Sequence, residues 1–131
     1  MKKFNYELLE NRKDQLVQDN SGPSRVYHVP NGTYPSITSL LYHIISKPGI
    51  EKWKARVGEE AAQKISTKAA RRGTRIHKYI ERYMEGDADY LKKSPPDHKE
   101  MVNLVVPQIN EKIDNIRGIE LGMWSDGLKV A

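Results

Sequence analysis

The sequence predicts an α+β protein that is mainly helical, and three observations support this fold class. A long pattern typical of an amphipathic helix runs from about Glu59 to Met84. A second helical pattern follows the start signal Ser94-Pro95-Pro96-Asp97. Short alternating stretches at residues 25–29 and 119–131 indicate strands. With 131 residues, the chain is long enough for one small domain.

The N-terminal part of the chain predicts little regular structure before the first strand. Residues 1–24 are polar and end in the turn signal 19–23, with a short helix or strand expected around residues 6–17. Residues 25–29 alternate as a short strand does, and Asn31-Gly32 is a pair typical of tight turns.

A helix is expected to begin after Pro35, with Ser36 as its cap. Lys47-Pro48-Gly49 should end this helix, and a second helical run should start at Ile50 and break at Gly58. The residues at helical spacing that form the apolar face are Ile37, Leu40, Leu41, Ile44 and Ile45.

The main helix should end at Gly86, which stands where a C-terminal cap is expected. The helix after Ser94 should kink at Pro107 and end at Gly118. Residues 119–131 then predict a strand, a turn at 125–127 and the start of a second strand. The chain therefore divides into a polar segment (1–24), a helical region (25–118) and the first strands of a core sheet (119–131).

The composition favours a polyanionic partner. The formal net charge is +5 and the isoelectric point is about 9.4. The chain has no cysteine, which excludes disulfides and thiolate-held metal sites. No secretory signal or membrane-spanning run is present, so we expect a cytoplasmic protein without a membrane partner.

The long helix carries two opposite faces when it is drawn at 100° per residue. The apolar face predicts a core contact and consists of Ala62, Ile65, Ala69, Gly73, Ile76, Ile80 and Tyr83. The other face is a line of six cations spaced alternately by four and three residues: Lys64, Lys68, Arg71, Arg75, Lys78 and Arg82. Such a line repels itself by roughly a few tenths of a kcal/mol per neighbouring pair, and a row of phosphates would relieve it. The alternative is an ordinary solvated helix face.

His77 and Glu81 lie one helical turn apart at the border of the apolar face. An imidazole and a carboxylate at this spacing can reach one ion, and Gly73 leaves space one turn earlier. The alternative is a His–Glu pair at the edge of the core. A hydrolytic metal site needs further oxygen ligands from elsewhere in the chain.

Three segments in order carry a resemblance to a known family: TYPSITSLL, KPGIEKWKARVGEEAAQKIS and AARRGTRIHKYIERYMEG. Together they resemble the RecB-like branch of the PD-(D/E)XK nuclease superfamily, particularly phage exonucleases and mitochondrial genome maintenance exonucleases. The likeness covers residues 27–131, and Trp53 to Glu81 is its most specific part. It implies the N-terminal helical region of a PD-(D/E)XK (restriction endonuclease-like) fold, with the start of its mixed sheet.

The resemblance also implies roles for individual residues. His77 matches the histidine that helps to hold a divalent metal, Mg²⁺ or Mn²⁺, and Glu81 matches a supporting active-site carboxylate. Glu120 matches an acidic position before the first core strand. Tyr34, Ser36 and Thr38 match a segment along the nucleic-acid path, although the two hydroxyl residues also suit helix caps. The residues expected to bind the DNA backbone are the six cations of the line and Arg72.

The implied function is a metal-dependent DNA exonuclease that acts on single-stranded DNA or DNA ends in a bacterial or phage-infected cell. The family's catalytic Asp and its D/E-x-K motif would follow Ala131, so we expect this chain to be an incomplete nuclease domain with little activity alone. The alternative is a non-catalytic basic helical module that binds nucleic acid. A third possibility is a small interaction protein whose basic face is incidental.

Overall fold

The computed structural model describes residues 1–131 and confirms an α+β protein with more helix than strand. The chain falls into two compact units, each built from two separate segments. Unit 1 comprises residues 1–9 and 60–119, and unit 2 comprises residues 10–59 and 120–131.

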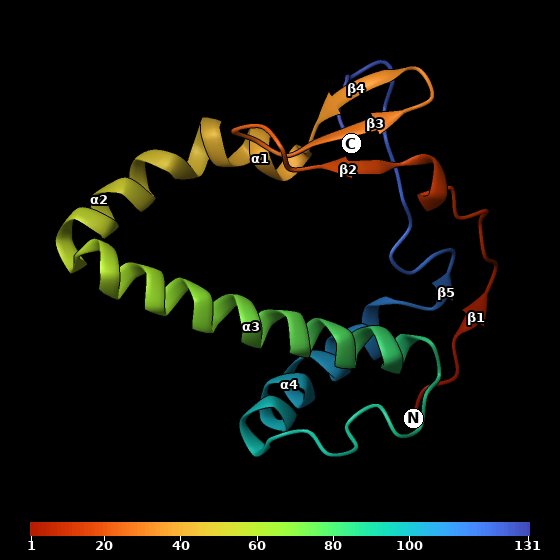
Figure 1. The fold of residues 1–131 in the computed structure, drawn as a ribbon. Coiled ribbons are helices and arrows are strands. Elements are labelled where there is room, and N and C mark those ends of the chain that lie inside the picture. Colours follow the sequence, from red (N-terminus) through yellow and green to blue (C-terminus); the bar gives the residue numbers. More distant parts are fainter. The chain divides into compact units, whose positions relative to one another are not determined.

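Unit 1 is organised around two helices, α3 (Glu59–Met84) and α4 (Pro96–Lys112) (Figure 1). The bounds of α3 agree with the sequence prediction. As predicted, the helix ends in a glycine cap: Gly86 has a φ of 83°, and its amide donates to the Tyr83 carbonyl oxygen at 3.1 Å. A left-handed residue at this point turns the chain out of the helix.

The core of unit 1 lies at the C-terminal end of α3. Its buried members are Phe4, Tyr83, Ile109 and Ile116. The rings of Phe4 and Tyr83 meet edge to face at 5.9 Å, and the hydroxyl of Tyr83 donates to Asn110 Oδ1 at 2.7 Å. The tyrosine is therefore both the largest fully buried side chain and hydrogen-bonded, as a buried polar group must be.

Helix α4 continues through Pro107 and ends at Lys112, six residues before the predicted end at Gly118. The prediction was wrong because β5 (Asn115–Ile116) pairs in parallel with β1 (Asn5–Tyr6). This pairing takes up backbone groups that a longer helix would use for itself. Sequence periodicity cannot detect a partner strand more than 100 residues away.

Unit 2 contains an antiparallel sheet of β2 (Val17–Asp19), β3 (Val26–Val29) and β4 (Gly32–Pro35), in that order. The predicted strand at residues 25–29 and the Asn31-Gly32 turn are confirmed, since Val29 pairs with Gly32 across the hairpin. Before β2, a single 3₁₀ turn covers Lys13–Gln15.

The helical part of unit 2 differs from its prediction at Lys47-Pro48-Gly49. Helix α1 (Ile37–Leu41) leads through a π-helical turn (Tyr42–Ser46) into α2 (Lys47–Val57). The Lys47-Pro48-Gly49 sequence thus begins a helix instead of ending one, because a proline in the first turn has no amide that needs an acceptor. Gly58, with a φ of 89°, ends α2 as predicted.

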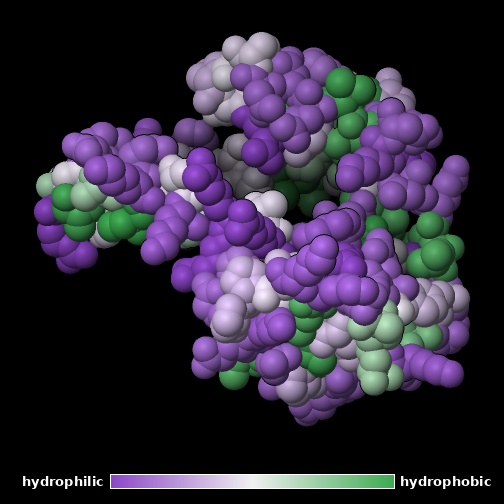
Figure 2. All heavy atoms as spheres, turned by 60° about the horizontal axis from the view of Figure 1, so that its bottom comes forward, coloured by the Kyte–Doolittle hydropathy of each residue, from purple (hydrophilic) through white to green (hydrophobic).

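The predicted apolar face of this helix is not a buried face. Ile37, Leu41, Ile44 and Ile45 are exposed and Leu40 is half-buried. Hydrophobic side chains consequently lie among hydrophilic ones on the surface of the molecule (Figure 2).

Residues 119–131 do not form the predicted pair of strands. The only pairing within this segment is an isolated bridge between Ser125 and Val130 around the expected turn. The end of the segment instead bonds to β4 and α1: the amide of Ala131 donates to the Pro35 carbonyl, and the amide of Ile37 donates to the Ala131 carbonyl. These bonds satisfy the backbone without a strand partner.

Candidate functional site

The apolar and basic faces of α3 are separated as the helical wheel predicts, but the apolar face is only partly a core. Tyr83 and Ala62 are buried, and Ile76 and Ile80 are half-buried. Ile65 is 53% exposed, because the core of unit 1 gathers around the C-terminal end of the helix. The N-terminal two-thirds of α3 is therefore largely a surface helix.

A pocket of about 580 Å³ lies on this surface, between the basic face of α3 and the first turn of α4. We call it the α3–α4 pocket. Its lining consists of Gln63, Lys64, Thr67, Lys68, Arg71, Arg72, Arg75, Asp97 and His98. It brings together five of the seven cations that the sequence assigned to the nucleic-acid backbone, and it leaves out Lys78 and Arg82.

Acidic partners divide these seven cations into two groups. Lys64 Nζ lies 2.7 Å from Glu60, and Lys78 Nζ lies 2.9 Å from Glu81, which raises the pKa of Lys78. Arg82 is bound to Asp87. The four cations with no carboxylate within ion-pair distance are Lys68, Arg71, Arg72 and Arg75. Uncompensated positive charge is thus concentrated on one stretch of α3.

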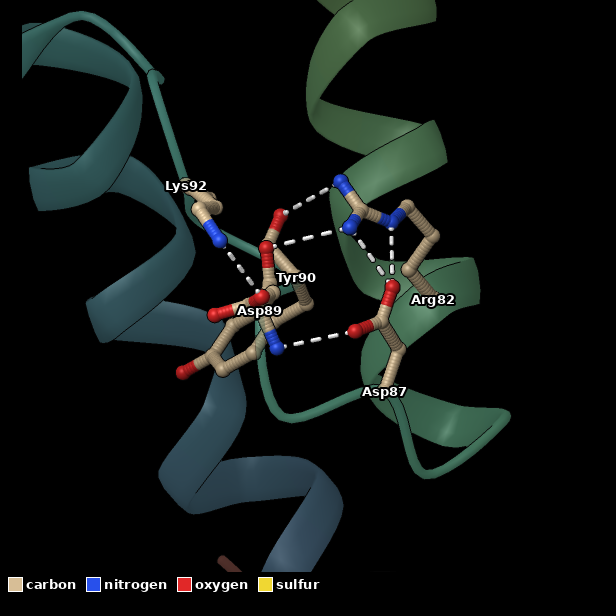
Figure 3. Close-up of polar contacts among 5 residues, drawn as sticks. All are labelled: Arg82, Asp87, Asp89, Tyr90 and Lys92. Carbon is tan, nitrogen blue, oxygen red and sulfur yellow. Dashed lines mark hydrogen bonds and ion pairs between the residues drawn. The ribbon is translucent and has the colours of Figure 1, made fainter.

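Arg82 has a structural role in unit 1 (Figure 3). Its Nε and one terminal nitrogen contact Asp87 Oδ2 at 2.7 and 2.6 Å, and its other guanidinium bonds go to the carbonyls of Asp89 and Tyr90. The Asp89 amide, and then the guanidinium, lower the pKa of the Asp87 carboxyl. The side chain therefore fixes the turn after α3, and these contacts use four of its five N–H donors.

His98 is a pocket residue that the sequence did not predict. It is 5% exposed and lines the α3–α4 pocket, and its Nδ1 is buried without a hydrogen-bond partner. Its Nε2 lies 3.9 Å from Asp97 Oδ2, and its ring packs against Tyr79 at 6.0 Å. Its local sequence shows only that it lies in the first turn of a helix that begins at Pro96.

His77 and Glu81, the two residues that the sequence predicts for a metal corner, lie four residues apart on α3. His77 is exposed on α3, and Glu81 is half-buried with Lys78 as its partner. A Cβ built on Gly73 meets no atom within 4 Å, so the space expected beside this turn is present. The imidazole is thus on the surface of unit 1 and not in its core.

A divalent metal would need more ligands than this corner provides. No group of three or more His, Asp or Glu side chains that could hold a metal ion occurs in residues 1–131. Mg²⁺ takes about six ligands, mostly oxygens, so the residues present do not fit a complete Mg²⁺ or Mn²⁺ site. Glu120, the other predicted acid, belongs to unit 2, where its φ of 54° places it in a left-handed bend and not in a strand.

The three residues predicted along the nucleic-acid path lie in unit 2, mostly below its surface. Tyr34 is 4% exposed and its hydroxyl donates to Asp126 Oδ1 at 2.6 Å, which leaves no ring face open to a base. This bond raises the pKa of Tyr34 and lowers that of Asp126. Ser36 is buried, and its hydroxyl lies 2.8 Å from that of Thr38, which is exposed. Ser36 precedes α1, but its side chain caps no amide.

Comparisons with known proteins give no relative: no family model, no curated protein and no solved structure matches this chain. None of the helices is long and apolar enough to cross a membrane.

Proposed function

We propose that this chain binds DNA, in single-stranded form or at ends, through contacts with the phosphate backbone along the basic face of α3. The observation that carries the proposal is the exposed stretch at residues 68–75, where four cations have no acidic partner. Cations held this close together on one helix repel each other, and phosphates relieve that repulsion while displaced counterions add to affinity. Contacts of this kind read no sequence.

The test is the salt dependence of binding to a labelled single-stranded oligonucleotide, measured by fluorescence anisotropy. The double variant Arg71→Ala/Arg72→Ala should weaken binding and reduce the slope of log K against log salt by about 1.4, roughly 0.7 for each single-strand phosphate that is no longer neutralised. Both side chains are exposed and unpaired, so the fold should not change.

A matched control is available on α2. Lys52 and Arg56 are exposed, lie one turn apart and make no ion pair, so Lys52→Ala/Arg56→Ala removes the same charge elsewhere. This variant should leave the slope close to that of the parent chain. An equal reduction of the salt slope in both double variants would show that only the net charge of the chain matters for DNA binding. No binding even at low salt would favour a protein-interaction role with an incidental basic face.

A metal-dependent exonuclease of the PD-(D/E)XK type is the second candidate. It is supported by the exposed position of His77 on the same helix as the basic face, one turn before Glu81. In this proposal Mg²⁺ or Mn²⁺ would lower the pKa of a bound water for attack on a phosphodiester. His77 and Glu81 would contribute to its site, and the remaining acids would come from outside residues 1–131.

The exonuclease proposal has a test that is separate from DNA binding. The reading frame beyond Ala131 should encode Gly-x-x-Asp and then a D/E-x-K strand, and the resulting longer protein should digest DNA with Mg²⁺ or Mn²⁺. His77→Ala should abolish this cleavage while DNA binding without metal persists. A frame that lacks those motifs, or cleavage that is unaffected by His77→Ala, defeats this candidate and leaves the binding function in place.

A further inference from the structure

We propose that the α3–α4 pocket binds a small polyphosphate anion, that is, a compact run of adjacent phosphate groups as in inorganic tripolyphosphate or a free nucleotide. The proposal uses the same cations as the DNA-binding function but goes beyond it, because it assigns them a second ligand. DNA binding needs only an exposed charged face, whereas this ligand needs a recess.

The shape of the site is the first argument. The recess has a volume of about 580 Å³, within the roughly 300–1,000 Å³ typical of small-molecule sites. That volume is more than one phosphate group fills. One wall is the basic face of α3 and the other is the first turn of α4, with Asp97 and His98. Two helices thus provide a concave site of a size that suits a short chain of phosphates.

The charge of the lining is the second argument. The lining holds five cations and a single carboxylate, that of Asp97. A compact anion with several charges neutralises such a cluster at one place. Arg71 and Arg72 both line the pocket, and the guanidinium group suits bidentate contact with phosphate oxygens.

The first turn of α4 adds unused polar groups on the opposite wall. The residue that caps the helix is Pro95, and no side chain caps the turn. The amides of a helix's first turn have no acceptor inside the helix, and the helix dipole favours an anion there. Independently, buried His98 lines the same pocket, and its Nδ1 has no hydrogen-bond partner, whereas almost all buried polar atoms are hydrogen-bonded.

The ligand class can be tested on the whole chain by isothermal titration with inorganic tripolyphosphate, ATP, AMP and inorganic phosphate. Tripolyphosphate and ATP should bind with similar affinity, and AMP and inorganic phosphate should bind at least about tenfold more weakly, because fewer charges meet the cluster. Equal affinity for phosphate and tripolyphosphate would overturn the proposal. So would binding of ATP without tripolyphosphate, since the base would then be the recognised group.

Variants locate the ligand. Arg71→Ala/Arg72→Ala should weaken tripolyphosphate binding about tenfold or more, and the α2 control Lys52→Ala/Arg56→Ala should change it less than about twofold. Asp97→Asn should strengthen binding, because it removes the only carboxylate of the lining. Unchanged affinity in the arginine double, or weaker binding in Asp97→Asn with an intact circular dichroism spectrum, contradicts the assignment.

A local signal separates this site from general attraction to a basic protein. On addition of tripolyphosphate, the imidazole resonances of His98 should shift more than those of His28 and His43, which lie in unit 2. DNA binding measured in the same buffer distinguishes the two proposals. DNA binding without tripolyphosphate binding defeats the polyphosphate site alone, and tripolyphosphate binding without DNA binding defeats the DNA-binding function alone.

Discussion

The two parts of α3 carry the same two-faced pattern, yet they have different surroundings. From Glu59 to Arg75 the helix is almost entirely exposed, with Ala62 as its only buried residue. From Ile76 to Met84 the apolar face packs against the core, and Tyr83 is 1% exposed. The cations differ in the same way, since Lys78 and Arg82 have acidic partners whereas the stretch at residues 68–75 has none.

This difference shows that one helical pattern supports two roles. The C-terminal part of α3 holds unit 1 together, because α4 and the N-terminal segment supply apolar and polar partners there. The N-terminal part faces the first turn of α4 across the α3–α4 pocket, and most of its side chains are exposed. Substitutions in the C-terminal part should therefore change stability, and those in the N-terminal part should change ligand binding.

The largest effect is expected at Tyr83. Tyr83→Ala should lower the free energy of unfolding by about 3–5 kcal/mol, because it leaves a cavity in the core and removes the partner of Asn110. Tyr83→Phe keeps the ring and should cost only about 1 kcal/mol. Urea denaturation followed by circular dichroism measures both, and losses of equal size would mean that packing around the ring is unimportant.

The next effect separates Arg82 from Arg75. Arg82→Ala should lower the melting temperature, since it breaks the bonds that fix the turn after α3, and it should leave the salt slope of DNA binding unchanged. Arg75→Ala should leave the melting temperature unchanged and reduce the salt slope of DNA binding, because its side chain has no acidic partner and lines the pocket. Thermal melts and anisotropy titrations measure the two variants. Equal changes in melting temperature and in salt slope would refute the division of α3 into a structural part and a ligand-binding part.

The two glycines of this region should respond with opposite signs. Gly73→Ala should stabilise the protein by roughly 0.5–1 kcal/mol, because alanine is a better helix former and its Cβ meets no atom. Gly86→Ala should destabilise it by about 1 kcal/mol, since its φ of 83° is unfavourable for any residue with a Cβ. Chemical denaturation measures the free energy of unfolding of both variants. A higher free energy of unfolding in both would show that the glycine cap is not required.

The smallest expected effect is a pH dependence of folding stability that comes from Asp87, after the end of α3. The pKa of Asp87 is below its ordinary value of 3.8, held there by the Asp89 amide and then by Arg82. A lowered folded-state pKa gives stability that is present above pH 3.8 and is lost as pH falls through the folded value. In thermal melts below pH 4, the melting temperature of Asp87→Asn should thus fall less steeply with decreasing pH than that of the parent chain. Parallel curves would argue against this contribution.

Local signals predicted a large part of the fold. The bounds of α3, its glycine cap, the strand at residues 26–29 and the turn at Asn31-Gly32 all follow from residues within a few positions of each other. The errors fall where distant partners decide. Residues 113–118 leave the helix to pair with the N-terminal segment, and residues 119–131 bond to the end of β4 instead of forming strands.

The candidate site divides in the same way. The periodicity of α3 located its basic face, because helical geometry fixes which side chains share a side. Sequence alone could not find His98, because only the packing of α4 brings it to the cations. The sequence also could not show that Arg82 forms an ion pair with Asp87, or that Tyr34 is buried and hydrogen-bonded to Asp126.

By itself, the sequence determined the long helix α3, its two faces and the excess of positive charge, because these depend on local geometry and composition. Tertiary structure alone decided which part of α3 is core, which cations remain uncompensated and where a pocket forms. The physical reason is that burial and charge compensation depend on partners distant in sequence, and those partners meet only when the chain has folded.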